Sequence, residues 1–343
     1  MTSPAPKTEK RRHAVMTDVA RLAGVSYQTV SRVLNESPLV RGETRERVLA
    51  AIRELDYRPN SVARALVTGR SKTLGVVTFD TKLYGPASTL LGIEQAAHDE
   101  GYAVSISSLR SLNRDTVLAA IEQLRDHGVD GVAVIAPVRA GFDALKHVRP
   151  DFPVVAAAVG SAASIPVASV DQTAGAAAAT RYLLSLGHKT VWHLAGPADW
   201  TEAEDRIEGW AAELEAAGAE LPDVLRGDWT PRSGYELGER LLEIRELTAV
   251  LVANDQMALG LLRRLHEAGR QVPRDLSVVG FDDIPEAAYL NPPLTTVRQD
   301  FSELGRLCLQ ILLRRIEGEL EPTRVVVPPE LVIRASTGPA RKR

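Results

Sequence analysis

Cysteine is almost absent from this chain of 343 residues, since Cys308 is its only thiol. A single cysteine excludes an intramolecular disulfide and a cysteine cluster for zinc. Because Cys308 lies in an apolar helical run, we interpret it as a buried, inert thiol rather than a nucleophile. The chain also lacks an apolar stretch of about 20 residues, and its first 15 residues lack the apolar core of a secretion signal. These absences predict a cytoplasmic protein that does not bind membranes.

Motifs that would support an enzyme are missing as well. No G-x-G-x-x-G sequence follows the apolar run around Val76, and G-x-x-x-x-G-K-[ST] occurs nowhere. None of the seven histidines lies in a metal-binding spacing such as H-x-x-x-H. A Ser–His–Asp arrangement is not excluded by composition, but no recognisable motif indicates one. We therefore expect no enzymatic activity, no cofactor and no bound metal.

The chain does contain a basic first part. Residues 1–71 hold 13 lysines and arginines against 7 acidic residues, whereas the remainder holds 28 against 37. The net charge of −3 thus conceals a charge of +6 on the first part and −9 on the rest. A basic head on an acidic body suits contact with phosphates, although charge alone does not exclude a role in solubility only.

Residues 16–35 predict a short helix, a turn at Gly24 and a second helix that begins after Ser26. In a helix-turn-helix, the second helix enters the major groove of DNA with its first residues facing base edges. Gln28 can pair with adenine and Arg32 with guanine. The face of this helix has hydrogen-bonding side chains and no acidic residue, namely Tyr27, Gln28, Ser31, Arg32 and Asn35. We therefore predict that this face binds DNA.

A third amphipathic helix and a linking segment follow in the sequence. The helix lies within RGETRERVLAAIRELDYRPN, and its apolar side should pack under the first two helices. The next residues, NSVARALVTGRS, are either a plain linker or a hinge that folds on DNA. In the second case, Leu66 would act as an apolar wedge between base steps of the minor groove.

From residue 72 onward, short apolar runs alternate with amphipathic helical stretches about ten times. This alternation predicts doubly wound parallel sheets, and the number of repeats suits two lobes better than one sheet. We expect a first lobe over about 72–170 plus 301–325 and a second lobe over about 171–300 plus 326–338. Ligands of such folds bind at the carboxyl ends of strands, which here meet in the cleft between the lobes.

Aromatic and hydrogen-bonding side chains follow several predicted strands of the second lobe. A sugar ring stacks its apolar face on an indole and pairs its hydroxyl groups with donors and acceptors. The candidates for such a site are Trp200, Arg206, Trp229, Asn254, Asp255 and Asp282. Trp192 and Trp210 are expected in the core, and Asp283 can simply cap a turn.

Residues 16–71 resemble the DNA-binding head of the LacI/GalR (lac-repressor) family of bacterial transcription regulators, most specifically in SYQTVSRV and YRPNSVARAL. The resemblance implies base contacts from Tyr27, Gln28 and Arg32, and the wedge role of Leu66. It also implies phosphate contacts from Ser26, Thr29, Ser31 and Asn35. Three residues of the hinge sequence complete the DNA-binding set: Tyr57, Asn60 and Ala63.

The body resembles the same family in GDW, LVANDQMALG, SVVGFDD and PPLTTVRQDF. This implies a periplasmic-binding-protein-like fold and a small effector. The implied ligands of the effector are Arg206, Trp229, Asn254, Asp282 and Phe301. The first lobe departs from the pattern, because Ile135 and Ala158 stand where the lac-repressor pattern has polar Asn and Asp. The expected effector is a sugar, with a β-galactoside, a plant-derived β-glucoside or an oligosaccharide as the working hypothesis.

Both halves together predict a sequence-specific transcriptional regulator, and specifically a repressor of sugar-utilisation genes whose operator affinity changes when the sugar binds. The expected layout is a disordered tail (1–15), a helix-turn-helix domain (16–60), a hinge (61–71) and an effector-binding and dimerisation body (72–343). A homodimer would place two recognition helices on a near-palindromic operator. The tail TGPARKR has no leucine heptads that would build a tetramer. The alternative class, a periplasmic sugar carrier, would need a secretion signal and would not need a basic head. For the regulator, we expect the sugar to release the protein from its operator rather than to act as a corepressor.

Overall fold

The computed structural model describes residues 14–34, 37–57, 69–111, 113–149, 151–157, 165–319 and 324–341. The chain forms two compact units, Met1–Ser71 and Lys72–Arg343, which are considered separately as the head and the body. Several predicted site residues lie outside the described residues, namely Asn35, Asn60, Ala63 and Leu66, as does Ala158.

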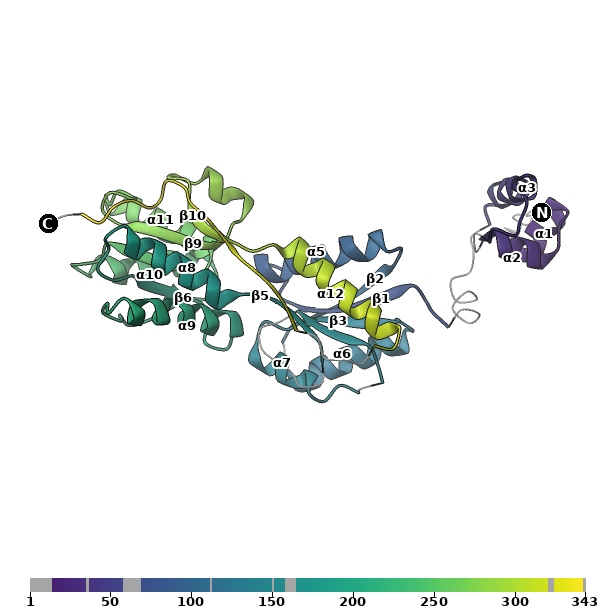
Figure 1. The fold of residues 1–343 in the computed structure, drawn as a ribbon, viewed down its shortest axis with the longest axis horizontal. Helices are drawn as coiled ribbons and strands as arrows, with labels where there is room; N and C mark the ends of the chain where they lie inside the picture. The colour runs from purple at the N-terminus through teal and green to yellow at the C-terminus, as the bar shows by residue number, and fades with distance from the viewer. Residues whose placement is uncertain are drawn as a thin grey trace, which may run out of the picture. The chain divides into compact units, whose positions relative to one another are not determined.

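The described residues of the head form three helices around a small apolar core (Figure 1). They are α1 (Met16–Ala23), α2 (Tyr27–Leu34) and α3 (Gly42–Glu54). Gly24 ends α1 with a left-handed backbone (φ 61°), which glycine adopts without steric cost. Val19, Val30 and Val48 bring one side chain from each helix into the core. The helix, glycine turn and helix predicted from the sequence are confirmed.

The first lobe of the body is a parallel sheet with helices on both faces. Its strand order is β11-β5-β4-β3-β1-β2. Figure 1 shows α5 and α12 on one face and α6 and α7 on the other. The elements are β1 (Thr73–Phe79), α5 (Tyr84–Asp99), β2 (Ala103–Leu109), α6 (Arg114–Asp126), β3 (Gly131–Ile135), α7 (Arg139–Leu145), β4 (Val154–Ala157), β5 (Val167–Val170), α12 (Phe301–Ile316) and β11 (Arg324–Val327).

The second lobe repeats this architecture with strand order β12-β10-β9-β8-β6-β7. Its edge strand β12 pairs with β10 in the antiparallel sense, and the other strand pairs are parallel. The elements are α8 (Gln172–Ser185), β6 (Trp192–Ala195), α9 (Thr201–Ala216), β7 (Leu225–Arg226), α10 (Pro231–Leu242), β8 (Ala249–Val252), α11 (Asp255–Glu267), β9 (Ser277–Asp282), the 3₁₀ helix η1 (Pro285–Tyr289), β10 (Thr295–Arg298) and β12 (Glu330–Val332).

Three described segments connect the two lobes. The chain passes from β5 to α8, from β10 to α12 and from β11 to β12; Figure 1 shows the last of these as the yellow segment. β11 belongs to the first sheet up to Val327, so the division expected after residue 325 falls inside this strand. The two predicted doubly wound sheets are confirmed, with β12 as the antiparallel exception.

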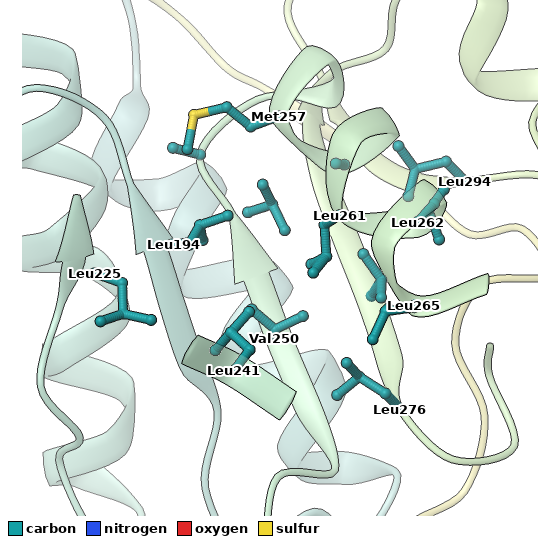
Figure 2. Close-up of a cluster of buried hydrophobic side chains, with 14 of the residues drawn as sticks. Leu194, Leu225, Leu241, Val250, Met257, Leu261, Leu262, Leu265, Leu276 and Leu294 are labelled. Carbon is teal, nitrogen blue, oxygen red and sulfur yellow. The ribbon is translucent and has the colours of Figure 1, made fainter. Parts of the chain in front are cut away.

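Each sheet buries one apolar cluster on each of its faces. Figure 2 shows the cluster of the second lobe in which Leu194 and Val250 of the sheet pack against Leu261 of α11. On the opposite face, Trp210 is 1% exposed and lies against His193, with 5.4 Å between ring centroids. Cys308 is fully buried in the first lobe, and burial raises the pKa of its thiol to about 12. Within the described ranges, no helix has the length and apolarity needed to cross a membrane.

Candidate functional site

The exposed face of α2 is the candidate DNA-binding surface. Ser26 caps the helix, because its hydroxyl accepts from the Thr29 backbone N–H at 3.2 Å. Tyr27 is 54% exposed, and Gln28 and Arg32 are exposed beside it. These side chains are therefore open to a partner. Ser31 and Thr29 are partly buried at the rim of the same face.

Tyr57 differs from the other predicted DNA-binding residues of the head. Its side chain is 8% exposed and belongs to the apolar core that joins the three helices. This is the position of a packing residue, and its ring is not part of the open face of α2. Its sequence neighbours in the expected hinge lie outside the described residues.

A cavity of about 670 Å³, including its open mouth, lies between the two lobes of the body. Residues from both sheets line it, at the carboxyl ends of their strands. Six of the predicted effector-binding residues line this one cavity: Trp200, Arg206, Trp229, Asn254, Asp282 and Phe301. The candidate Asp255 is not part of the lining, because its carboxylate accepts from Thr296 Oγ1 and from the Ile284 N–H within the second lobe. The structure therefore brings together the side chains that the sequence placed after separate strands.

Arg206 is the centre of a buried polar network at the base of the cavity. It is 4% exposed; its Nε donates to Gln172 Oε1 at 2.8 Å, and its Nη1 donates to the Ala253 carbonyl. Gln172 Nε2 donates to Gln299 Oε1 at 2.7 Å, and Gln299 Nε2 donates to Asp282 Oδ1 at 2.6 Å. Arg206 Nη2 lies 3.8 Å from the same Asp282 oxygen, which closes the ring. Such a network holds its members in one geometry.

The electrostatics of this network follow from its burial. Burial raises the pKa of the Asp282 carboxyl to about 6, against the opposing effect of the Arg206 charge. The guanidinium also lies over the ring of Phe281, 3.9 Å from its centroid. Asp282 adopts a positive φ of 111°, which turns it at the end of β9. Its carboxylate and the guanidinium together offer acceptors and donors of opposite charge to a ligand.

Two indole rings form the aromatic wall of the cavity. Trp200 and Trp229 are in edge-to-face contact, with 5.2 Å between their centroids. Trp229 fits because Gly196 has no side chain; a Cβ there would lie 2.3 Å from the indole. The Nε1 of Trp229 is buried and has no hydrogen-bond partner among the described residues.

Asn254 has a structural role in addition to its place in the cavity lining. It is the N-cap of α11, where its Oδ1 accepts from Met257 N at 2.8 Å. Its Nδ2 donates to the Trp229 carbonyl at 3.1 Å. Since an amide has two N–H groups and an oxygen with two lone pairs, Asn254 keeps one donor and one acceptor site for a ligand.

The first-lobe wall of the cavity is mostly apolar. It comprises Leu83, Pro86, Ile135, Pro137, Ala157, Val170 and Leu304, with Tyr84, Thr89 and Ser169 as polar members. Ile135 lies in the cavity lining, as its place at the end of β3 suggested. The polar groups of the cavity therefore come mainly from the second lobe.

The sequence patterns did not indicate six polar residues of the cavity: Gln172, Glu202 and Gln299, and the first-lobe residues Tyr84, Thr89 and Ser169. Gln299 lies within the motif PPLTTVRQDF, and Gln172 is the second residue after β5, so strand-end position was an available signal for both. Glu202 lies in the first turn of α9 and had no such signal. Nowhere in the described part of the chain do three or more His, Cys, Asp or Glu side chains gather as metal ligands would.

A short backbone bridge connects the lobes beside the cavity. Val138, next to β3, pairs with Trp200, next to α9, in an isolated antiparallel β-bridge. Arg139 N donates to the Asp199 carbonyl at 3.1 Å, and Thr201 N donates to the Pro137 carbonyl at 3.0 Å. These contacts hold the two lobes together at the edge of the cavity.

A helical head with an open recognition face, joined to a two-lobed body with a polar interlobe cavity, defines a DNA-binding regulator that responds to a small ligand. Two family models match the chain: "Bacterial regulatory proteins, lacI family" over residues 15–60 and "Periplasmic binding protein-like domain" over residues 180–337. The chain belongs to the lacI family of bacterial regulatory proteins. It is a DNA-binding transcriptional repressor of that family and not an enzyme.

Curated relatives match nearly the whole chain. It is 35% identical over 332 residues to the HTH-type transcriptional repressor PurR of Haemophilus influenzae, covering 94% of this chain and 98% of the relative. It is 35% identical over 323 residues to the lactose operon repressor of Escherichia coli, covering 93% and 89%. It is 36% identical over 342 residues to the HTH-type transcriptional regulator CelR of Thermobifida fusca, covering 96% and 99%.

Solved structures show the same fold. The lac repressor dimer bound to operator and the anti-inducer ONPF has a TM-score of 0.85 at 33% identity, covering 95% of this chain and 100% of that one. The complex of the transcriptional regulator CelR with cellobiose has a TM-score of 0.68 at 32% identity, covering 94% and 99%.

Proposed function

We propose that this repressor controls sugar-utilisation genes and that a sugar bound between the two lobes changes its affinity for the operator. The observation that carries the proposal is the interlobe cavity, in which two indole rings stand beside the buried Arg206–Asp282 network. Aromatic faces with paired donors and acceptors suit the two chemistries of a sugar ring. The solved CelR structure is a cellobiose complex, and lac repressor structures contain ONPF or ONPG.

The effector we favour is a β-glucoside or a β-galactoside. Its hydroxyl groups would pair with Arg206, Asn254 and Asp282, and its apolar ring face would stack on Trp229. Trp200 and Phe301 would complete the enclosure of the ring. Because the first-lobe wall is mostly apolar, few hydroxyl groups on that side of the ligand would find a partner. A second sugar or an aglycone would lie there through its apolar surface.

On the DNA side, α2 would enter the major groove with Tyr27, Gln28 and Arg32 facing base edges. Their exposure supports this role. Ser26, Thr29, Ser31 and Asn35 would contact phosphates, and Asn60, Ala63 and Leu66 would contact DNA from the hinge sequence. We propose that the protein works in the cytoplasm as a homodimer on a near-palindromic operator, with the sugar releasing it from DNA.

The experiment is a titration of labelled near-palindromic operator with the protein at fixed salt, followed by fluorescence anisotropy. Cellobiose, lactose, ONPG and monosaccharides are then added to the complex. We expect one sugar to change operator affinity by more than tenfold, within the range of typical allosteric coupling. Arg206→Ala should abolish the sugar response and retain operator binding. Operator binding without any sugar response would reject the sugar effector, and no preference over competitor DNA would reject the operator specificity.

A further inference from the structure

The first turn of α9 connects the cavity to the bridge between the lobes. Glu202 lines the cavity, and Thr201 lies between Glu202 and the first-lobe residue Pro137. Thr201 Oγ1 is 3.0 Å from the Pro137 carbonyl oxygen and 3.1 Å from Glu202 Oε2. One hydroxyl group thus has two acceptors, one in each lobe.

The hydrogen count at this hydroxyl decides what the two contacts can do. A threonine hydroxyl donates one hydrogen, whereas the Pro137 carbonyl and an ionised Glu202 carboxylate only accept. Thr201 Oγ1 can therefore donate to Pro137 or to the carboxylate, but not to both. The Thr201 hydroxyl is free to donate to Pro137 in two cases. Either the Glu202 carboxyl is protonated, or the Glu202 carboxylate accepts a hydrogen bond from another donor in place of Thr201.

Glu202 is placed to receive such a donor. It is partly buried in the cavity lining, and burial raises the pKa of its carboxyl to about 7, against the effects of its own backbone N–H and of the Arg206 charge. The side-chain partner that the structure gives it is the Thr201 hydroxyl. The donors that the structure gives this carboxylate are its own backbone N–H and the Thr201 hydroxyl. Because a carboxylate has about four acceptor sites, it can also accept from a sugar hydroxyl in the cavity.

We propose that Glu202 binds a hydroxyl group of the effector and, through Thr201, couples occupancy of the cavity to the hydrogen bonding between the lobes. When the sugar donates to Glu202, the Thr201 hydroxyl donates to Pro137. The bridge then gains a side-chain hydrogen bond beside the backbone bond from Thr201 N. Glu202 thereby also selects sugars that present a hydroxyl at this end of the cavity. This inference rests on the proposed sugar effector and adds the residues that transmit its binding.

The test is a double-mutant cycle in the full chain with Glu202→Gln and Thr201→Val. Thr201→Val keeps the side-chain shape and the backbone bond but removes the hydroxyl. Glu202→Gln removes the charge. Cellobiose is the probe, with ONPG in its place if cellobiose does not bind. Its dissociation constant is read from tryptophan fluorescence, because Trp200 and Trp229 line the cavity.

We expect Glu202→Gln to weaken probe binding about tenfold or more, the range of a hydrogen bond to a charged group, and Thr201→Val to weaken it several-fold. The double variant should bind no more weakly than Glu202→Gln alone, because both residues act in one relay. Thr201→Ser, which restores the hydroxyl, should bind within twofold of the wild type. Glu215→Gln, exposed at the far end of α9, is the matched control and should bind like the wild type.

Three outcomes would overturn the inference. If either single variant binds the probe like the wild type, the relay is wrong while the sugar effector stands. If the two losses multiply in the double variant, the residues act independently and no coupling exists. If neither cellobiose nor ONPG binds the wild type, the proposed sugar effector fails, and the inference fails with it.

Discussion

Replacing Arg206 with Met tests the buried network at the base of the cavity. The guanidinium donates to Gln172 Oε1 and to the Ala253 carbonyl, and it lies 3.8 Å from Asp282 Oδ1. Methionine fills similar space but donates no hydrogen bond. The variant therefore leaves two buried acceptors and one buried carboxylate without their partner.

The expected decrease in the free energy of unfolding is the sum of these three losses. Without the guanidinium, the buried Asp282 carboxyl must take up a proton. Because its pKa is about 6, this protonation costs about 2 kcal/mol of free energy at pH 7.5, at about 1.4 kcal/mol for each pKa unit. Two unpaired buried acceptors add about 1 kcal/mol each. The free energy of unfolding should fall by about 4 kcal/mol. Removing one partner of a buried ion pair typically lowers it by about 3–5 kcal/mol. At pH 5 Asp282 is already mostly protonated, so the loss should be about 2 kcal/mol smaller.

The assay is urea unfolding of the full chain at pH 7.5 and pH 5, followed by tryptophan fluorescence. All four tryptophans lie in the body, so the signal does not report on the head. Adding Asp282→Asn to Arg206→Met should recover about 2 kcal/mol at pH 7.5, because Asn needs no proton. Arg232→Met, at an exposed pair with Glu236, is the matched control and should change stability by less than about 0.5 kcal/mol. A loss below 1 kcal/mol, or one independent of pH, would refute this reasoning.

Three further predictions concern packing, reactivity and pH. Gly260→Ala should destabilise the body by at least about 2 kcal/mol in the same titration, because a Cβ would lie 1.7 Å from the Pro231 carbonyl oxygen; Gly85→Ala, which meets only one atom at 3.9 Å, should not. The Cys308 thiol should react with a disulfide reagent only after unfolding, and prompt reaction in the folded protein would contradict its burial. The pKa of the Glu202 carboxyl is about 7 in the folded protein and about 4.5 in the unfolded chain. Between these two pH values the folded state binds the proton more tightly, so the contribution of Glu202 to the free energy of unfolding is lost as the pH rises from about 4.5 to about 7. Glu202→Gln should therefore raise the melting temperature relative to the wild type more at pH 8 than at pH 5, and the opposite trend would count against the assignment.

Local sequence determined the elements and much of the candidate site. The spacing of Val30 and Val33 and the cap at Ser26 depend on neighbours within one or two helical turns, so the recognition helix was predictable. The candidates Trp200, Arg206 and other cavity residues were found because strands of a doubly wound sheet end at one edge. This rule needs only the order of strands and helices.

Long-range contacts account for what was missed. Gln172 and Gln299 bond to each other across 127 positions in the chain, and nothing in either local sequence indicates the pairing. Asp255, in the VANDQ run beside Asn254, turns away from the cavity. Its carboxylate accepts from Thr296 Oγ1 at 2.6 Å and from the Ile284 N–H at 2.9 Å. It therefore holds the second lobe together, although its place in the sequence resembles that of a ligand residue.

The sequence by itself determined that this protein has a basic helix-turn-helix head, two doubly wound sheets and an aromatic, polar set of strand-end residues, because periodicity, capping and strand order are local properties of the chain. Only the tertiary structure decided which of those residues share one cavity. It also decided that Arg206 forms a ring with Gln172, Gln299 and Asp282, and that Thr201 stands between Glu202 and Pro137 of the other lobe. The physical reason is that hydrogen bonds between distant segments form only after both sheets have buried their apolar faces, which brings these side chains within about 3 Å of one another.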